Sequence, residues 1–172
     1  MSPVIEGAID VRSYAGVPGA GTSEVQTLTI AGTPTGGTFR VAFDGQISAD
    51  ITWSADNATL LANIQAALDA MANVGTNGCV AAAGTLTSGI GTITLTFGAN
   101  LAKLAVNLMT VQNNSLTGTA PTLAIAETTP GVTAGERGAA PGALLVDTTN
   151  KLLYINTGTA LAPTWTKVGT QT

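Results

Sequence analysis

The chain has 172 residues, of which 9% are charged, and it contains no histidine and one cysteine. Without histidine it lacks the commonest general acid–base group at neutral pH and the commonest metal ligand, so we expect neither catalytic nor metal-binding residues. Six scattered basic residues and a net charge of −4 exclude a nucleic-acid-binding surface and disfavour an anionic membrane as a partner, because both need concentrated positive charge.

The apolar residues predict a thin core and no exported or membrane-spanning segment. Alanine supplies much of the apolar share and aromatic residues only 4%, so we expect oligomerisation or docking to add stability. Residues 1–6 lack a basic segment followed by an apolar run, and no apolar stretch is long enough to span a membrane. The lone Cys79 lies in a stretch typical of a buried strand, which favours a core residue over a reactive thiol.

Residues 1–23 are predicted to form an extended N-terminal arm. Its second half, residues 15–23, is rich in glycine, proline and small side chains, which hold neither a helix nor a central strand. Its first half is more apolar than a solvated tail requires. Two interpretations stay open: a disordered tail, or an arm that becomes ordered against a neighbour.

Residues 24–130 are predicted to form the core domain, beginning with strands. Residues 25–30 alternate in polarity as a half-buried strand does, and residues 32–37 are expected to form a loop. Asp44-Gly45 is the signal of a two-residue hairpin turn, which needs positive φ. The flanking strands are expected to place these residues on one face each: Phe39, Val41 and Phe43 before the turn, and Ile47, Ala49, Ile51 and Trp53 after it.

The rest of the core domain is predicted to contain one helix and four further strands. Apolar residues follow helical spacing over residues 57–72, with Asp56 as the N-cap and residues 73–75 as the stop. Strand patterns follow at residues 80–83, 92–97, 105–112 and 122–127. The predicted fold class is therefore α+β, with a mainly antiparallel sheet or sandwich and one packed helix.

Residues 131–172 are predicted to form a linker and a small C-terminal β unit. Residues 144–147 and 152–155 flank a turn as a hairpin, and residues 164–168 form a last strand. Three short strands are marginal alone, so this unit needs a partner surface, either the main domain or another subunit.

The residues that carry chemistry elsewhere have ordinary structural explanations here. The glycine-rich segments lack the lysine and the spacing of a phosphate loop, and Asp44 and Asp50 do not form a convincing carboxylate pair. Hydroxyl nucleophiles need a base, and no histidine supplies one. Trp53 and Trp165 are more typical of core or interface anchors than of sugar platforms. We expect no cofactor.

Two parts of the chain resemble modules of structural proteins from tailed bacteriophages. The first comprises Glu-Val-Gln-Thr-Leu-Thr-Ile at residues 24–30, residues 32–39, Phe-Asp-Gly-Gln at residues 43–46, the helix of residues 57–71 and Leu-Thr-Gly-Thr-Ala-Pro-Thr at residues 116–122. The second comprises residues 141–159, which are similar to a module common near the ends of tail fibres, head fibres and capsid-surface proteins.

The resemblance, together with the short chain, implies a capsid decoration (cement) protein of the virion. Such a protein binds the major capsid protein on the outer capsid surface, usually as a homotrimer, and braces the shell. An alternative is a tail- or head-fibre-associated adhesion module that binds a host surface glycan, and a third is a cell-wall hydrolase, which the missing histidine disfavours. The candidate capsid or subunit contacts lie in the arm and the C-terminal strands: Val4, Ile5, Ile9, Val11, Tyr14, Leu152, Tyr154 and Trp165.

Overall fold

The structure is a computed structural model that describes residues 11–14 and 19–171. It divides into two compact units: unit 1 combines the two chain ends, and unit 2 spans Thr22–Val132. The fold is mostly β, with 47% strand, one antiparallel and one mixed sheet, and one α-helix among the described residues. The predicted fold class is confirmed.

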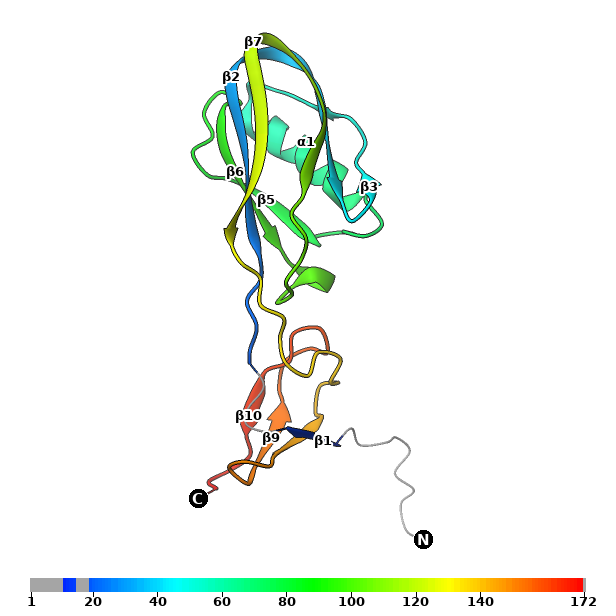
Figure 1. Ribbon diagram of the computed structural model, residues 1–172, viewed down its shortest axis with the longest axis vertical. Coiled ribbons are helices and arrows are strands. Elements are labelled where there is room, and N and C mark those ends of the chain that lie inside the picture. Colours follow the sequence, from blue (N-terminus) through cyan, green and yellow to red (C-terminus); the bar gives the residue numbers. More distant parts are fainter. Residues whose placement is uncertain (1–10, 15–18, 172) are drawn as a thin grey trace. The chain divides into compact units, whose positions relative to one another are not determined.

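Unit 2 is built around a long antiparallel ribbon of β2 (Val25–Phe43) and β7 (Thr110–Thr129) (Figure 1). The ribbon bends over, so the two halves of β2 pair with different neighbours. The first half pairs with β6 (Gly91–Phe97), which pairs in turn with β5 (Cys79–Ala83). The second half pairs with the short strands β3 (Gln46–Ile47) and β4 (Ile51–Thr52).

The loop predicted at residues 32–37 is wrong, because β2 continues through this segment while paired with β7. Gly32 and Gly37 adopt φ of +82° and +92°, and a Cβ at either position would lie 2.2 Å from a carbonyl oxygen of β7. The register shifts between Ala31 and Thr33 and between Pro34 and Gly36. Glycine therefore allows the ribbon to bend without losing its pairing.

The helix α1 (Asn57–Asp69) packs its apolar stripe into the core of unit 2. The predicted N-cap is confirmed, since the side chain of Asp56 accepts a 2.8 Å hydrogen bond from the Thr59 N–H. The helix ends three residues before the predicted boundary. Its buried residues Leu60, Ile64 and Leu68 belong to the same cluster as the phenylalanines of β2 and β6.

The predicted hairpin turn at Asp44-Gly45 is confirmed by φ values of 44° and 80°, but the strand after it is interrupted. Ser48 is buried: its N–H donates to the Val41 carbonyl, and its Oγ accepts from the Val41 N–H. This exchange separates β3 from β4. The prediction that alternate residues from Ile47 to Trp53 lie on one face is wrong, since Ile47 and Ala49 are exposed whereas Ile51 is buried.

The strand predicted at residues 105–112 is also wrong over most of its length. Residues 99–101 form a 3-10 helix, η1 (Ala99–Leu101), and β7 begins only at Thr110. The N–H groups of Val106 and Met109 donate to the buried side chains of Glu24 and Gln26, at 3.0 and 2.9 Å. These side-chain oxygens accept the hydrogen bonds that backbone carbonyls of a neighbouring strand would otherwise accept.

Unit 1 is a four-stranded mixed sheet in the order β1-β8-β9-β10. Strands β8 (Leu144–Asp147) and β9 (Leu152–Asn156) form the predicted hairpin, and β10 (Trp165–Lys167) is the predicted last strand. Strand β1 (Val11–Tyr14) belongs to the predicted arm and pairs in parallel with β8. The remainder of the arm before residue 19 lies outside the described residues.

Candidate functional site

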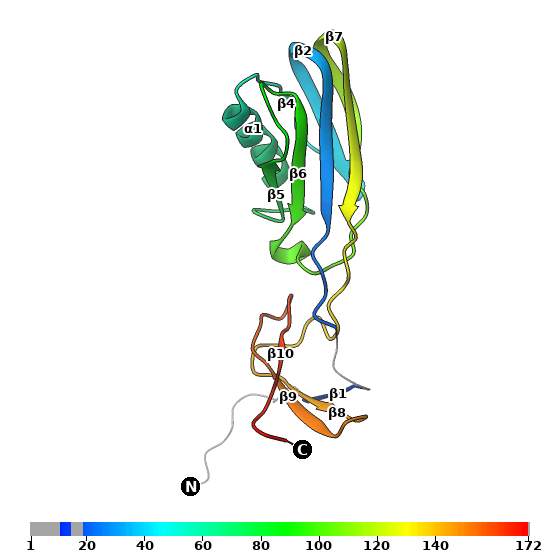
Figure 2. The same cartoon turned by 90° about the vertical axis from the view of Figure 1, so that its left-hand side faces the viewer.

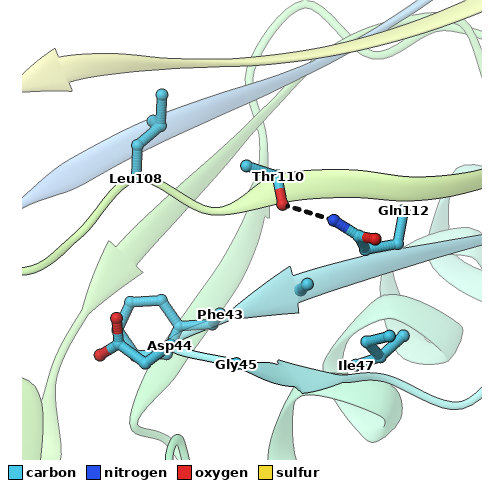
Figure 3. Close-up of a pocket in the computed structure, with 8 residues that line it drawn as sticks. Phe43, Asp44, Gly45, Ile47, Leu108, Thr110 and Gln112 are labelled. Atoms are coloured by element: carbon cyan, nitrogen blue, oxygen red, sulfur yellow. Dashed lines mark hydrogen bonds between the residues drawn. The ribbon is translucent and has the colours of Figure 1, made fainter.

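A hollow of about 340 Å³ lies between the turn after β2 and the start of β7 (Figure 3). Asp44 is the sole ionisable group among its lining residues, and its Oδ1 accepts a 2.7 Å hydrogen bond from Asn107 Nδ2. Gln112 donates to Thr110 Oγ1 across 3.0 Å, and the exposed side chains of Ile47 and Leu108 form walls. This hollow therefore contains no pair of acidic and basic side chains, and most of its lining is uncharged.

Asp50 and Cys79, a carboxylate and the thiol of the described residues, have ordinary structural roles. Arg40 Nε donates to Asp50 Oδ1 at 2.6 Å, and this hydrogen bond lowers the pKa of Asp50. Cys79 is buried, and burial, with a smaller contribution from the charge of Asp69, raises the pKa of its thiol to about 12. Three or more potential metal-ligating side chains do not gather anywhere in the described ranges, and no helix there is long and apolar enough to cross a membrane.

One face of the unit 1 sheet is covered by the chain itself. Leu145 is fully buried on this face, together with Ala134, Ala139 and Ala143 from the preceding segment. Asn156, which is 1% exposed, holds that segment in place: its Nδ2 donates to the Ala139 carbonyl at 2.8 Å, and its Oδ1 accepts from two backbone N–H groups at 2.9 Å. Asn156 therefore organises the covered face, a role that the sequence patterns did not indicate.

The opposite face of this sheet is aliphatic and is not covered by the described residues. Side chains alternate along a strand, so the residues next to Leu145 in each strand point away from the covered face. Val11 is 60% exposed, Val146 39% and Val168 37%, and three half-buried side chains lie between them. The pairing register of β1, β8, β9 and β10 places six aliphatic residues on this face, together with Thr166 opposite Ile155. These six residues are called the aliphatic face: Val11, Leu144, Val146, Leu153, Ile155 and Val168.

The predicted contact residues are divided between the two faces. Val11 lies on the aliphatic face, whereas the register places Leu152, Tyr154 and Trp165 on the covered face, where each is half-buried. Trp165 Nε1 is buried without a hydrogen-bond partner among the described residues.

The other predicted contacts lie in the arm. The backbone of Tyr14 pairs with Asp147, and Val4, Ile5 and Ile9 lie outside the described residues. The sequence patterns missed five of the six residues of the aliphatic face, since that face exists only once both chain ends pair.

Unit 2 also presents an uncharged surface, on the outside of the sheet formed by β5, β6, the first half of β2 and the second half of β7. Buried Leu28 and Leu95 mark the inner face, and the alternate residues point outward. Ala82, Thr94, Thr27 and Ala126 form one row across all four strands. This threonine face consists of Val25, Thr27, Thr29, Val80, Ala82, Thr92, Thr94, Thr96, Ala124, Ala126 and Thr128.

Strand β7 forms an edge of this sheet and is its outermost strand in Figure 2. Within the described part of the chain it pairs only with β2. None of its residues is fully buried, and over its 20 residues it carries a single charged side chain, Glu127. Edge strands of monomeric proteins are usually protected by lysines, bulges or a covering segment.

Comparison with known protein families finds no match, and no curated protein matches the chain in sequence. A proposal of function therefore depends on the surfaces of this molecule and on the resemblance expected from its sequence.

Proposed function

We propose that the protein decorates the outer surface of a tailed-bacteriophage capsid and stabilises the shell by binding the major capsid protein. The observation that carries the proposal is the aliphatic face of unit 1. Four of its six residues, at positions 144, 146, 153 and 155, lie in the part of the chain that resembles the phage capsid-surface module, and they give that module a surface suited to docking on another protein.

The chemistry of the aliphatic face favours a protein partner. Burying aliphatic surface contributes about 25 cal/mol per Å², and an exposed apolar patch on a small unit is typical of an interaction site. Arg12, whose neighbours in the register lie on the covered face, is paired with Glu136 at 2.8 Å. Docking on the aliphatic face therefore removes apolar side chains from water without desolvating these charges.

The two tryptophans favour this proposal over glycan binding. Trp53 is half-buried, and its Nε1 donates to the Gly89 carbonyl at 2.9 Å. Trp165 is half-buried with a fully buried Nε1. Both rings are engaged in packing, whereas a sugar platform needs an exposed aromatic face.

The proposal is tested by measuring co-sedimentation with capsid shells prepared from particles that lack this protein. Val146→Asp places a charge in the middle of the aliphatic face, and Val11→Asp does so at its edge, where the side chain is most exposed. Each is expected to weaken shell binding at least about tenfold, since an unpaired charge is costly to bury. The matched control, Ala58→Asp, adds the same charge to the exposed first turn of α1 and is expected to bind as the unchanged protein does.

Circular dichroism and Trp165 fluorescence establish that the variants are folded. Full binding by both aliphatic-face variants would overturn the proposed surface. Failure of the unchanged protein to bind the shells would overturn the proposed function itself.

A further inference from the structure

The backbone of β2 determines which groups of β7 face outward. The Phe97 N–H donates to the Glu24 carbonyl at 2.9 Å, and in an antiparallel pair the residues that exchange hydrogen bonds alternate along each strand. Even-numbered residues at the start of β2 therefore bond to β6, and odd-numbered residues bond to β7. Thr27 and Thr29 pair with Ala126 and Ala124 in this register.

The intervening residues of β7 consequently direct their backbone groups away from β2. These are Leu123, Ile125 and Glu127, which lie opposite the even-numbered residues of β2. Within the described part of the chain, no backbone or side-chain hydrogen bond reaches the N–H or C=O groups of these three residues. Residues 123–127 are therefore an open edge whose natural partner is another extended strand.

The first half of β7 differs, because a side chain covers part of its edge. Asn114 Oδ1 accepts from the Leu116 N–H at 3.2 Å, and Asn114 Nδ2 donates to the Pro121 carbonyl at 3.1 Å. The open edge thus begins after Pro121, beyond the segment that the Asn114 side chain covers. It contains no lysine or proline to oppose pairing.

We propose that residues 123–127 pair with the same segment of a second copy of this chain, in an antiparallel ladder with two-fold symmetry. With Ile125 opposite its own copy and Leu123 opposite Glu127, all three outward-facing residues of each chain exchange hydrogen bonds. This register is isologous, so one surface serves both copies. The inference goes beyond capsid binding and does not depend on it.

The side chains of this segment complement themselves in the proposed register. The single charge of each edge, Glu127, lies opposite Leu123, so no like charges face each other. Ala124 lies opposite Ala126, two small exposed side chains that leave room for the second strand. The threonine faces of the two copies then form one continuous uncharged surface, because side chains alternate along β7 and the register places Glu127 on the opposite face of the sheet.

Cysteine crosslinking tests the register directly. Residues 124 and 126 of opposite copies form a non-hydrogen-bonded pair, whose Cα atoms lie about 4.5 Å apart, within the range of a disulfide. Under mild oxidation, an equimolar mixture of Ala124→Cys and Ala126→Cys proteins is expected to form a disulfide-linked dimer, whereas each variant alone is not. Cys79 is buried and remains protonated, so the unchanged protein is the control for its reactivity.

A second pair of variants tests the hydrogen bonds. Glu127→Pro removes an outward-facing N–H without removing a bond to β2, and we expect the mass measured by sedimentation to fall from two copies to one. Glu127→Gln keeps the N–H and is expected to remain paired.

Crosslinking of either cysteine variant alone would overturn the register. A monomer would overturn the pairing. A trimer in which no sample crosslinks would also overturn it and would favour the three-fold arrangement implied by the phage resemblance. Shell co-sedimentation of the Glu127 variants is measured separately, so loss of pairing and loss of capsid binding are distinguishable.

Discussion

Gln26 is expected to be a principal stabilising residue of unit 2, although it is polar. Its side chain is fully buried, and it joins β2 to the segment that precedes β7. Oε1 accepts from the Met109 N–H at 2.9 Å, and Nε2 donates to the Asn107 carbonyl at 3.0 Å and to Glu24 Oε1 at 2.5 Å. We predict that Gln26→Leu lowers the free energy of unfolding of unit 2 by about 2–4 kcal/mol.

This magnitude follows from what the substitution leaves behind. The Met109 N–H is buried and loses its acceptor, at a cost of about 1–3 kcal/mol, and the buried Glu24 carboxylate loses a donor, which costs more because it is charged. Leucine has a similar volume, and burying its side chain returns about 2 kcal/mol. The orphaned polar groups therefore outweigh the apolar gain.

Urea unfolding followed by tryptophan fluorescence measures this effect. In a Trp165→Phe background the signal comes from Trp53, which lies in unit 2. For a urea slope of about 1–3 kcal/mol per M, the midpoint is expected to fall by about 1–2 M. Gln112→Leu, at an exposed glutamine of β7, is the control and is expected to change stability by less than about 0.5 kcal/mol. Equal midpoints for both variants would refute the role assigned to Gln26.

Three further predictions concern the helix cap, the thiol and unit 1. The hydrogen bond from Thr59 lowers the pKa of Asp56 in the folded protein. The cap therefore contributes its full stability above the pKa that Asp56 has in the unfolded chain, and this contribution is lost as the pH falls through the lower pKa of the folded state. Asp56→Ala is expected to remove this acid-dependent part of the urea midpoint. Because burial raises the pKa of Cys79 to about 12, a thiol reagent near neutral pH is expected to label the protein only after unfolding. Asn156→Ala orphans two backbone N–H groups and is expected to lower the thermal midpoint seen by Trp165, with Trp53 as the internal control.

Local patterns were sufficient to predict those features that nearby residues determine. The turn at Asp44-Gly45 needs positive φ at two successive positions, and few other residue pairs supply it. The cap at Asp56 depends on a backbone N–H three residues later. The helix stripe and the C-terminal hairpin likewise depend on periodicity within one segment, so the sequence contains all the information that they require.

The wrong predictions concern features that depend on distant residues. Residues 32–37 contain the same glycines whether the chain forms a loop or a bent strand, and pairing with β7 decides between them. The segment before β7 contains apolar residues typical of a strand, yet its N–H groups bond to side chains 82 and 83 residues earlier. Spacing along the chain does not reveal such a contact.

The candidate docking surface stays a prediction, and the sequence supplied only the segments that contribute to it. The sequence indicated the chain ends as the candidate docking region, and both ends contribute to the unit 1 sheet. Which face is free depends on the segment that covers Leu145 and on the parallel pairing of β1 with β8, neither of which leaves a local signal. Alternation within β9 identified apolar residues, but Tyr154 and its neighbour Ile155 point to opposite faces.

The two proposed contacts use different chemistry, and this difference makes them separable by substitution. The aliphatic face depends on side chains, so Val146→Asp is expected to disrupt it, whereas Val146→Ile keeps its apolar character. The β7 edge depends on backbone groups, so Glu127→Pro is expected to disrupt it and Glu127→Gln is not. Neither contact has a charged group at its centre, so both are expected to vary little with ionic strength, unlike ion-pair interfaces. A chain with only 9% charged residues is suited to this type of assembly, because burying uncharged surface avoids the cost of desolvating charges.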